Sequence, residues 1–182
     1  SGNSNVGLGT DVLYKNVTGS NNVGLGTTSL NDNISGWNNI AIGSYALRKN
    51  TSGGTNIAIG YQTLFENTTG VGLIAIGTDA LKSNTAGINS LGVGSSALSL
   101  NTTGNNNSAF GSEALEYNST GNSNTAIGYR SMQYSTTGSE NVAVGMASLN
   151  YNTTGSSNTA VGYQAAYDNT TGFENVAIGY RA

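Results

Sequence analysis

A motif glycine returns every 17 residues along the chain, and this spacing limits what the chain can fold into more than any other feature. With no insertion or deletion between copies, the glycine stands at Gly9, Gly26, Gly43, Gly60, Gly77, Gly94, Gly111, Gly128, Gly145, Gly162 and Gly179. A second glycine keeps the same spacing, from Gly19 to Gly172. A fixed period this short is typical of a solenoid, in which each repeat forms one coil that stacks on its neighbours. The sequence therefore predicts a rod of stacked coils.

The unbroken period predicts one continuous repeat domain over residues 1–182, with about 10.7 coils. The chain begins and ends in mid-repeat, so we expect it to be an excerpt of a longer fibre protein. Charged residues make up only 8%, and a net charge of -3 provides no basic stripe that would bind nucleic acid. No apolar run is long enough to span a bilayer, so we expect no membrane insertion in this segment.

The chain contains no cysteine and no histidine, which limits the chemistry it can perform. Soft-metal sites, cysteine or histidine nucleophile systems and Ser-His-Asp triads all need one of these residues. The acidic residues share no common register, so the periodic Asp of a calcium-binding roll is missing. We therefore expect no catalytic residue, no metal and no cofactor, and predict that the protein is not an enzyme.

A short strand is predicted directly before each motif glycine. The residue before the glycine is always apolar, the second before it is always Ala or Gly, and the third is usually β-branched, as in Ile57-Ala58-Ile59. This alternation has the period of a β-strand. We expect the large side chains, such as Ile59, to lie inside the coil and the Ala or Gly to face outwards.

The second half of each coil carries another apolar column, four residues after the motif glycine. This leucine column consists of Leu13, Leu30, Leu47, Leu64, Leu81, Leu98, Leu115, Met132, Leu149 and Ala166. An Asn usually stands three residues later and is followed by a Thr-Thr-Gly turn, and stacked Asn side chains are expected to satisfy one another there. A leucine-rich repeat would carry several leucines per coil, whereas this chain has one. We predict an all-β protein, a β-solenoid with a second short strand or arc after the glycine.

The small residues on the strand need a reason, because a solvent-facing position normally varies among polar types. Close packing against a second polypeptide would explain why only Ala and Gly occur there. The predicted contact in a homotrimer is therefore formed by Ala41, Ala58, Ala75, Ala109, Ala126, Ala143, Ala160 and Ala177.

The motif Asn-(Val/Ile/Thr)-Ala-(Val/Ile)-Gly, as in residues 124–128 and 175–179, resembles the head repeat of trimeric autotransporter adhesins, the YadA-like head. The longer unit, which ends in Asn-Thr-Thr-Gly, is similar to repeats in phage tail-fibre shafts and other bacterial trimeric surface fibres. This resemblance covers the whole chain. It implies a left-handed parallel β-roll, three copies of which pack around a common axis.

The resemblance also implies a function, that of a structural or adhesive segment of a trimeric extracellular fibre. Such a segment acts as a rigid spacer or head in surface attachment, on an outer-membrane-anchored fibre of a cell surface or on a virion tail fibre. Its partners would be two further copies of the chain and a glycan or protein of the host or prey surface. The alternative is a stand-alone binding module that recognises glycan, extracellular matrix or ice through a flat Thr or Tyr face.

Aromatic residues are the candidate binding residues, because they fall into shared registers. Tyr117, Tyr134 and Tyr151 lie between the leucine column and the Asn turn, and Tyr129, Tyr163 and Tyr180 directly follow the motif glycine. A row of exposed aromatic rings can bind sugars or apolar protein surfaces, although a stack of tyrosines can also be structural. A third register, expected to be exposed or at a subunit contact, contains Trp37, Val71, Ile88 and Phe173.

Overall fold

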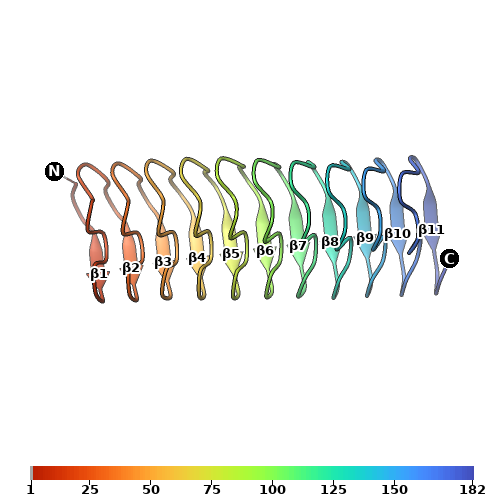
Figure 1. The fold of residues 1–182 in the computed structure, drawn as a ribbon, viewed down its shortest axis with the longest axis horizontal. Helices are drawn as coiled ribbons and strands as arrows, with labels where there is room; N and C mark the ends of the chain where they lie inside the picture. Colours follow the sequence, from red (N-terminus) through yellow and green to blue (C-terminus); the bar gives the residue numbers. More distant parts are fainter. Residues whose placement is uncertain (1) are drawn as a thin grey trace.

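The computed structural model describes residues 2–182 and shows a straight rod of stacked coils with the termini at opposite ends (Figure 1). Each coil contributes one short strand. The strands are β1 (Val6–Leu8), β2 (Val23–Leu25), β3 (Ile40–Ile42), β4 (Ile57–Ile59), β5 (Ile74–Ile76), β6 (Leu91–Val93), β7 (Ser108–Phe110), β8 (Thr125–Ile127), β9 (Val142–Val144), β10 (Thr159–Val161) and β11 (Val176–Ile178). Among the described residues, no helix is long and apolar enough to cross a membrane.

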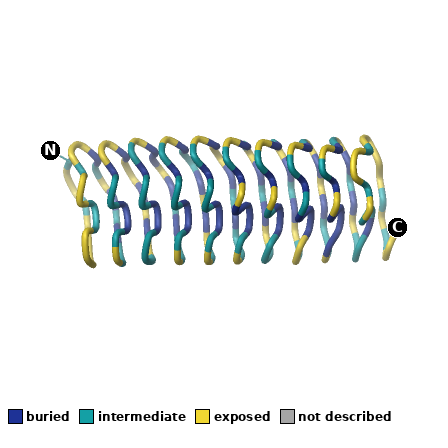
Figure 2. The backbone as a smooth tube through the Cα atoms, in the orientation of Figure 1, coloured by how far each residue is buried: buried dark blue, intermediate teal, exposed yellow. Residues whose placement is uncertain are grey.

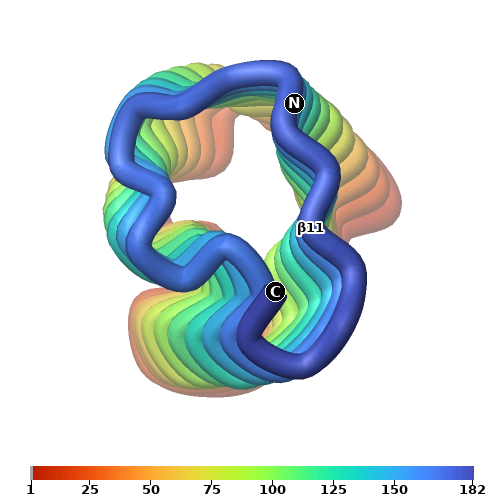
Figure 3. The backbone as a smooth tube through the Cα atoms, turned by 90° about the vertical axis from the view of Figure 1, so that its right-hand side faces the viewer, coloured from red at the N-terminus to blue at the C-terminus, as the bar shows by residue number. Residues whose placement is uncertain are grey.

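The strands form a single parallel sheet whose order follows the sequence from β1 to β11. Each strand pairs with the next in a register of one period, so that Ala41 faces Ala58 and Ile42 faces Ile59. Viewed along the rod, the coils lie almost on top of one another with a gradual drift (Figure 3). The predicted β-solenoid of 17-residue coils is therefore confirmed.

The rest of each coil is an arc of turns. Of the two alternatives predicted after the glycine, a second short strand or an arc, the described residues form the arc. The arc bends because residues with positive φ recur in every coil, as at Asn38 (54°), Tyr45 (64°) and Leu47 (50°). The motif glycine is also required: Gly60 has φ 135°, and a Cβ there would lie 2.8 Å from the carbonyl oxygen of Gly77. Stacking at this corner therefore depends on glycine.

The strands face the opposite way from the prediction. From β2 to β10 the central Ala or Gly of the strand is buried, and the residues on either side are more exposed, as the alternation of colours along the tube shows (Figure 2). In β3, Ala41 is fully buried, whereas Ile40 and Ile42 are 37% and 36% exposed. Ile59, which was predicted to lie in the core, is only half-buried on the outer side.

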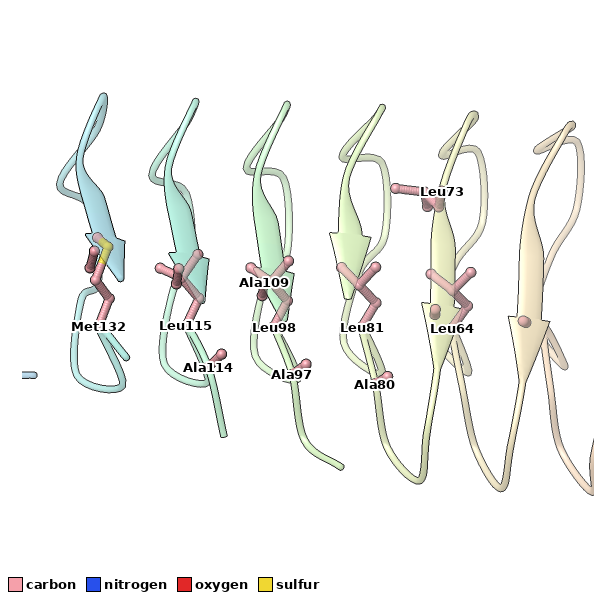
Figure 4. Packing of buried hydrophobic residues seen from close by; sticks show 14 of the residues in the cluster. Leu64, Leu73, Ala80, Leu81, Ala97, Leu98, Ala109, Ala114, Leu115 and Met132 are labelled. Carbon is pink, nitrogen blue, oxygen red and sulfur yellow. The ribbon is translucent and has the colours of Figure 1, made fainter. Parts of the chain in front are cut away.

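The reason is that the leucine column already fills the interior opposite the strand (Figure 4). Leu64 and Leu81 are fully buried, as predicted. A Cβ added to Gly92 of β6 would lie 3.1 Å from the carbonyl oxygen of Ala97 and 3.4 Å from the Leu81 side chain. The space between strand and arc therefore admits a methyl group and nothing larger.

The predicted trimer contact through the strand alanines is wrong for the same reason. Side chains that lie inside one coil cannot touch another chain. Fully buried are Ala41, Ala58, Ala75, Ala109, Ala126, Ala143 and Ala160, and partly buried, in the last coil, is Ala177.

Asparagine side chains form two hydrogen-bonded columns inside the rod, as expected from the stacked Asn turns. In the column seven residues after the motif glycine, Nδ2 of Asn50 donates to Oδ1 of Asn33 at 2.7 Å and to the carbonyl of Gly53 at 3.0 Å. In the column four residues before the glycine, Asn39 donates to Oδ1 of Asn22 from both its backbone N and its Nδ2, at 3.0 and 3.1 Å. These bonds satisfy buried polar groups at both turns and join each coil to the next.

One coil interrupts the first asparagine column. Ser135 stands where the other coils carry Asn, and its side chain is too short to continue the ladder. The Oδ1 atom of Asn118 and the Oγ atom of Ser135 are both buried without a hydrogen-bond partner. On the other side of the gap, Nδ2 of Asn152 donates only to the carbonyl of Gly155, at 2.8 Å. The gap leaves two unpaired polar atoms, which is a local cost in stability.

Candidate interaction surfaces

The strand face carries a long row of exposed apolar side chains along the rod. We call the residues one and three positions before each motif glycine the outer columns. The first of these is apolar in every coil: Leu8, Leu25, Ile42, Ile59, Ile76, Val93, Phe110, Ile127, Val144, Val161 and Ile178. The exposed fractions in the middle of the rod include 56% for Phe110 and 45% for Ile127. With coils about 4.8 Å apart and three residues per strand, the strip covers roughly 500 Å².

The largest apolar patch of a single soluble chain is typically a few hundred Å² and is often a binding surface. In the C-terminal half the strip is widened by the residues that directly follow the motif glycine. These are the predicted candidates Tyr129, Tyr163 and Tyr180, with Met146 between the first two. The rings of Tyr163 and Tyr180 stack at 5.2 Å, and the Arg130 guanidinium lies 4.8 Å from the Tyr129 ring centroid.

The other three candidate tyrosines stack on one another as predicted. Ring centroids are 5.1 Å apart for Tyr117 and Tyr134 and 5.0 Å apart for Tyr134 and Tyr151, with interplanar angles of 26° and 5°. Tyr167 packs edge-on against Tyr151 at 5.2 Å. The ring faces therefore cover each other, and the ring edges are what the stack presents to solvent. A sugar that needs a free ring face therefore finds none on Tyr134, whose two faces are both covered.

The same register holds ion pairs in the N-terminal half. Lys15 and Asp32 are 2.8 Å apart, and so are Lys49 and Glu66. These partners are partly exposed, so each pair contributes little to stability. The register thus joins neighbouring coils by opposite charges at one end of the rod and by aromatic stacking at the other.

A further ion pair joins neighbouring coils beside the tyrosine stack. Nε of Arg130 lies 2.6 Å from Oε2 of Glu113, and this hydrogen bond raises the pKa of Arg130 above its ordinary value. Gln133 donates to the carboxylates of Glu113 and Glu116 at 2.9 and 2.7 Å. No group of three or more acidic residues close enough to hold a metal ion occurs among residues 2–182.

The threonines of the turn are used within the rod. The hydroxyl residue that follows the turn Asn donates to a carbonyl of the next coil from Thr51 to Thr153, as from Thr68 to Thr85 at 3.0 Å and from Thr136 to Thr153 at 2.9 Å. Its partner in the pair, such as Thr69 or Thr103, is exposed. Only one of the two threonine columns is therefore free to meet a ligand.

The register of Trp37 lies on the surface, as expected. Trp37 is 47% exposed, and Ile88 and Phe173 are also exposed, whereas Val71 is half-buried. Gly54, which occupies this register one coil after Trp37, lies beneath the indole ring, a contact that the repeat pattern alone did not predict. The sequence does contain one indication of this contact, because Gly54 is the one glycine in this register from Ser20 to Phe173.

The coils, their register and their single strand define a parallel β-solenoid of 17-residue repeats. No protein family, no curated protein and no solved structure matches the chain. Its function must therefore be argued from its own surfaces.

Proposed function

We propose that the chain is a segment of a homotrimeric extracellular fibre and serves as a rigid spacer or head in surface attachment. The outer columns form the contact between the three copies. The observation that carries the proposal is the first outer column, in which eleven successive coils place an apolar side chain on the outside. A column that stays apolar on a solvent-facing side is best explained by a partner that covers it.

Symmetry favours further copies of the same chain as this partner. The strip runs straight along one side of the rod, so parallel copies can turn their strips towards a common axis and close the assembly. Burying an Ile or Val fully contributes about 1.5–3 kcal/mol, and outer side chains such as Ile42, Ile76 and Ile127 still have 36%, 37% and 45% of their surface to cover. The choice of three copies and of a left-handed coil rests on the resemblance to trimeric adhesin heads.

Rigidity follows from the bonding between coils. Strand, arc and turn all donate backbone hydrogen bonds to neighbouring coils, as from Ile40 to Asn56 at 2.8 Å and from Leu47 to Thr63 at 3.0 Å. The asparagine columns add side-chain bonds along the same axis. A rod bonded in this way resists bending and suits a spacer that holds a binding tip away from a cell or virion.

Cross-linking of single cysteines tests the contact, because the native chain contains no cysteine. Ile127→Cys places a thiol in the outer column, and Thr137→Cys places one in the exposed threonine column of a nearby turn. A short bismaleimide should join copies through Cys at position 127 and leave the position 137 variant as single chains on a denaturing gel. Equal cross-linking of both variants, or none of either, would contradict the proposed contact.

A further inference from the structure

Trp37 is the only tryptophan of the chain, and its ring lies over the one glycine of its register. A Cβ added to Gly54 would be 2.7 Å from Cε2 and 2.9 Å from both Cδ2 and Nε1 of Trp37. Two of these atoms, Cε2 and Cδ2, belong to the bond that fuses the two rings. An approach to the edge of an indole meets peripheral atoms first, so Gly54 lies beneath the face of the ring.

The second face of the indole is open. Trp37 remains 47% exposed although Gly54 covers one face, and no aromatic ring or cation packs against it among residues 2–182. The described part of the chain also offers no hydrogen-bond partner to Nε1 of the indole. This differs from the tyrosine stack, where each inner ring face is covered by the next ring. Trp37 therefore presents a flat, free aromatic face and a free N–H donor.

Two exposed asparagines stand close to Trp37 along the backbone. Asn38 follows Trp37, and its backbone N bonds the carbonyl of Ser20 at 3.0 Å, which places Asn21 beside it in the preceding coil. Asn21 and Asn38 have φ of 58° and 54°, both are exposed, and neither side chain makes a hydrogen bond within the described chain. On the other side, the backbone N of Thr55 bonds the carbonyl of Trp37 at 2.9 Å.

The charge of this surface is also informative. Residues 16–31, 33–47 and 50–65 contain no Asp, Glu, Lys or Arg. A cationic or anionic ligand would find no counter-charge in these stretches. Amide donors and acceptors beside an aromatic face instead match a ligand that has C–H groups on one face and hydroxyls around its rim.

We propose that Trp37 is a stacking platform for a neutral saccharide, specifically a β-linked pyranose whose hydroxyls are equatorial. The axial C–H groups of such a sugar carry a small positive charge and pack on the negative face of the indole. Its rim hydroxyls reach the amides of Asn21 and Asn38 and the indole N–H. Gly54 allows the indole to lie against the backbone, because a side chain at this position would push the ring away. The platform exists within one chain and does not depend on the trimer.

Titration with cellohexaose, followed by tryptophan fluorescence, tests this site directly, because a single indole supplies the whole signal. We expect a saturable change with a Kd of about 1 mM, as suits one stacked ring and a few hydrogen bonds. Absence of a change at saccharide concentrations well above this value would overturn the proposal.

Calorimetric titration extends the test to variants. Trp37→Ala should weaken binding roughly tenfold or more, and Trp37→Phe, with a smaller ring, should weaken it less. Gly54→Val should also weaken binding while Trp37 is intact, because it displaces the ring. The control Tyr134→Ser removes an aromatic residue whose faces are covered and should leave affinity unchanged. Undiminished binding by Trp37→Ala, or an equal loss in Tyr134→Ser, would contradict the assignment.

Discussion

The strand face and the Thr-Thr-Gly turn divide polar and apolar groups in opposite ways. At the strand, a small apolar side chain points inwards and two large apolar side chains point outwards, as in Ile40-Ala41-Ile42. At the turn, an amide such as Asn50 points inwards and donates to Asn33 of the preceding coil, and the half-buried Thr51 donates its hydroxyl to Thr68 of the next coil. The turn is complete within one chain. The strand face leaves large apolar side chains exposed on the single chain.

This difference shows that the rod does not depend on its largest apolar residues for its interior. Leucines, alanines and hydrogen-bonded asparagines fill the inside. The isoleucines and valines of the outer columns lie outside the coil, where the proposed contact between copies would cover them. In a narrow coil, an apolar residue therefore does not indicate by itself whether its side chain points to the inside or to the outside of the coil.

The largest expected effect separates inside from outside within one coil. Leu98 is fully buried, and Leu100, two residues later, is 43% exposed. Leu98→Asp buries an unpaired carboxylate and should lower the free energy of unfolding by several kcal/mol. Leu100→Asp should change it by less than about 0.5 kcal/mol, because the same register accepts Asp32 and Asp168 in other coils. Urea unfolding followed by circular dichroism measures both, and similar losses would contradict the assignment.

A second pair of variants tests the direction of the strand side chains. Ala126→Leu forces three more carbons into the space beside the leucine column and should cost about 3 kcal/mol. The neighbouring Ile127→Leu keeps its volume on the outer side and should cost no more than about 1 kcal/mol. If Ala126→Leu is tolerated as well as Ile127→Leu, the strand faces have been assigned backwards.

The tyrosine stack should stabilise the rod without contributing to binding. Tyr134→Ser removes the middle ring and both of its stacking contacts, each of which contributes about 0.5–1.5 kcal/mol. Thermal unfolding should therefore shift to lower temperature. Replacement of Tyr117, Tyr134 and Tyr151 together by Ser should lower it further and leave attachment to a glycan array unchanged. Lost attachment with unchanged stability would instead identify the stack as a binding site.

The smallest expected effect is a gain in stability at the interrupted asparagine column. Ser135→Asn supplies a donor to Oδ1 of Asn118 and an acceptor to Nδ2 of Asn152, and should raise the free energy of unfolding by about 1 kcal/mol. Ser135→Ala removes the unpaired hydroxyl without completing the ladder and should gain less. A gain from Ala equal to that from Asn would show that the ladder itself contributes nothing.

Most of the fold could be predicted from the sequence, because a constant period fixes the register of every coil. The strand position, the buried leucine column and the asparagine ladders all follow from that period together with simple patterns. The direction of the strand could not be predicted in this way. Alternation places Ala58 on one side and Ile57 and Ile59 on the other, but it does not specify which side is inside. That depends on how closely the arc approaches the strand, which the recurring positive φ angles determine.

The surfaces could be predicted only in part for a similar reason. A shared register correctly placed Tyr117, Tyr134 and Tyr151 in one column, but ring orientation decides whether a column is a stack or a binding face. The contact between Trp37 and Gly54 joins residues one period apart, and each is unremarkable when the sequence is followed residue by residue. The contact becomes visible when the residues of one register are compared from coil to coil.

The mass of the unmodified chain in solution tests the central claim, which is that the outer columns are covered by further copies. Light scattering coupled to size exclusion should give about 55 kDa, three times the 18.4 kDa of one chain. Ile76→Asn together with Ile127→Asn should shift this mass towards that of one chain, because the amides cannot be paired in an apolar contact. A folded species of 18.4 kDa from the unmodified chain would contradict the account.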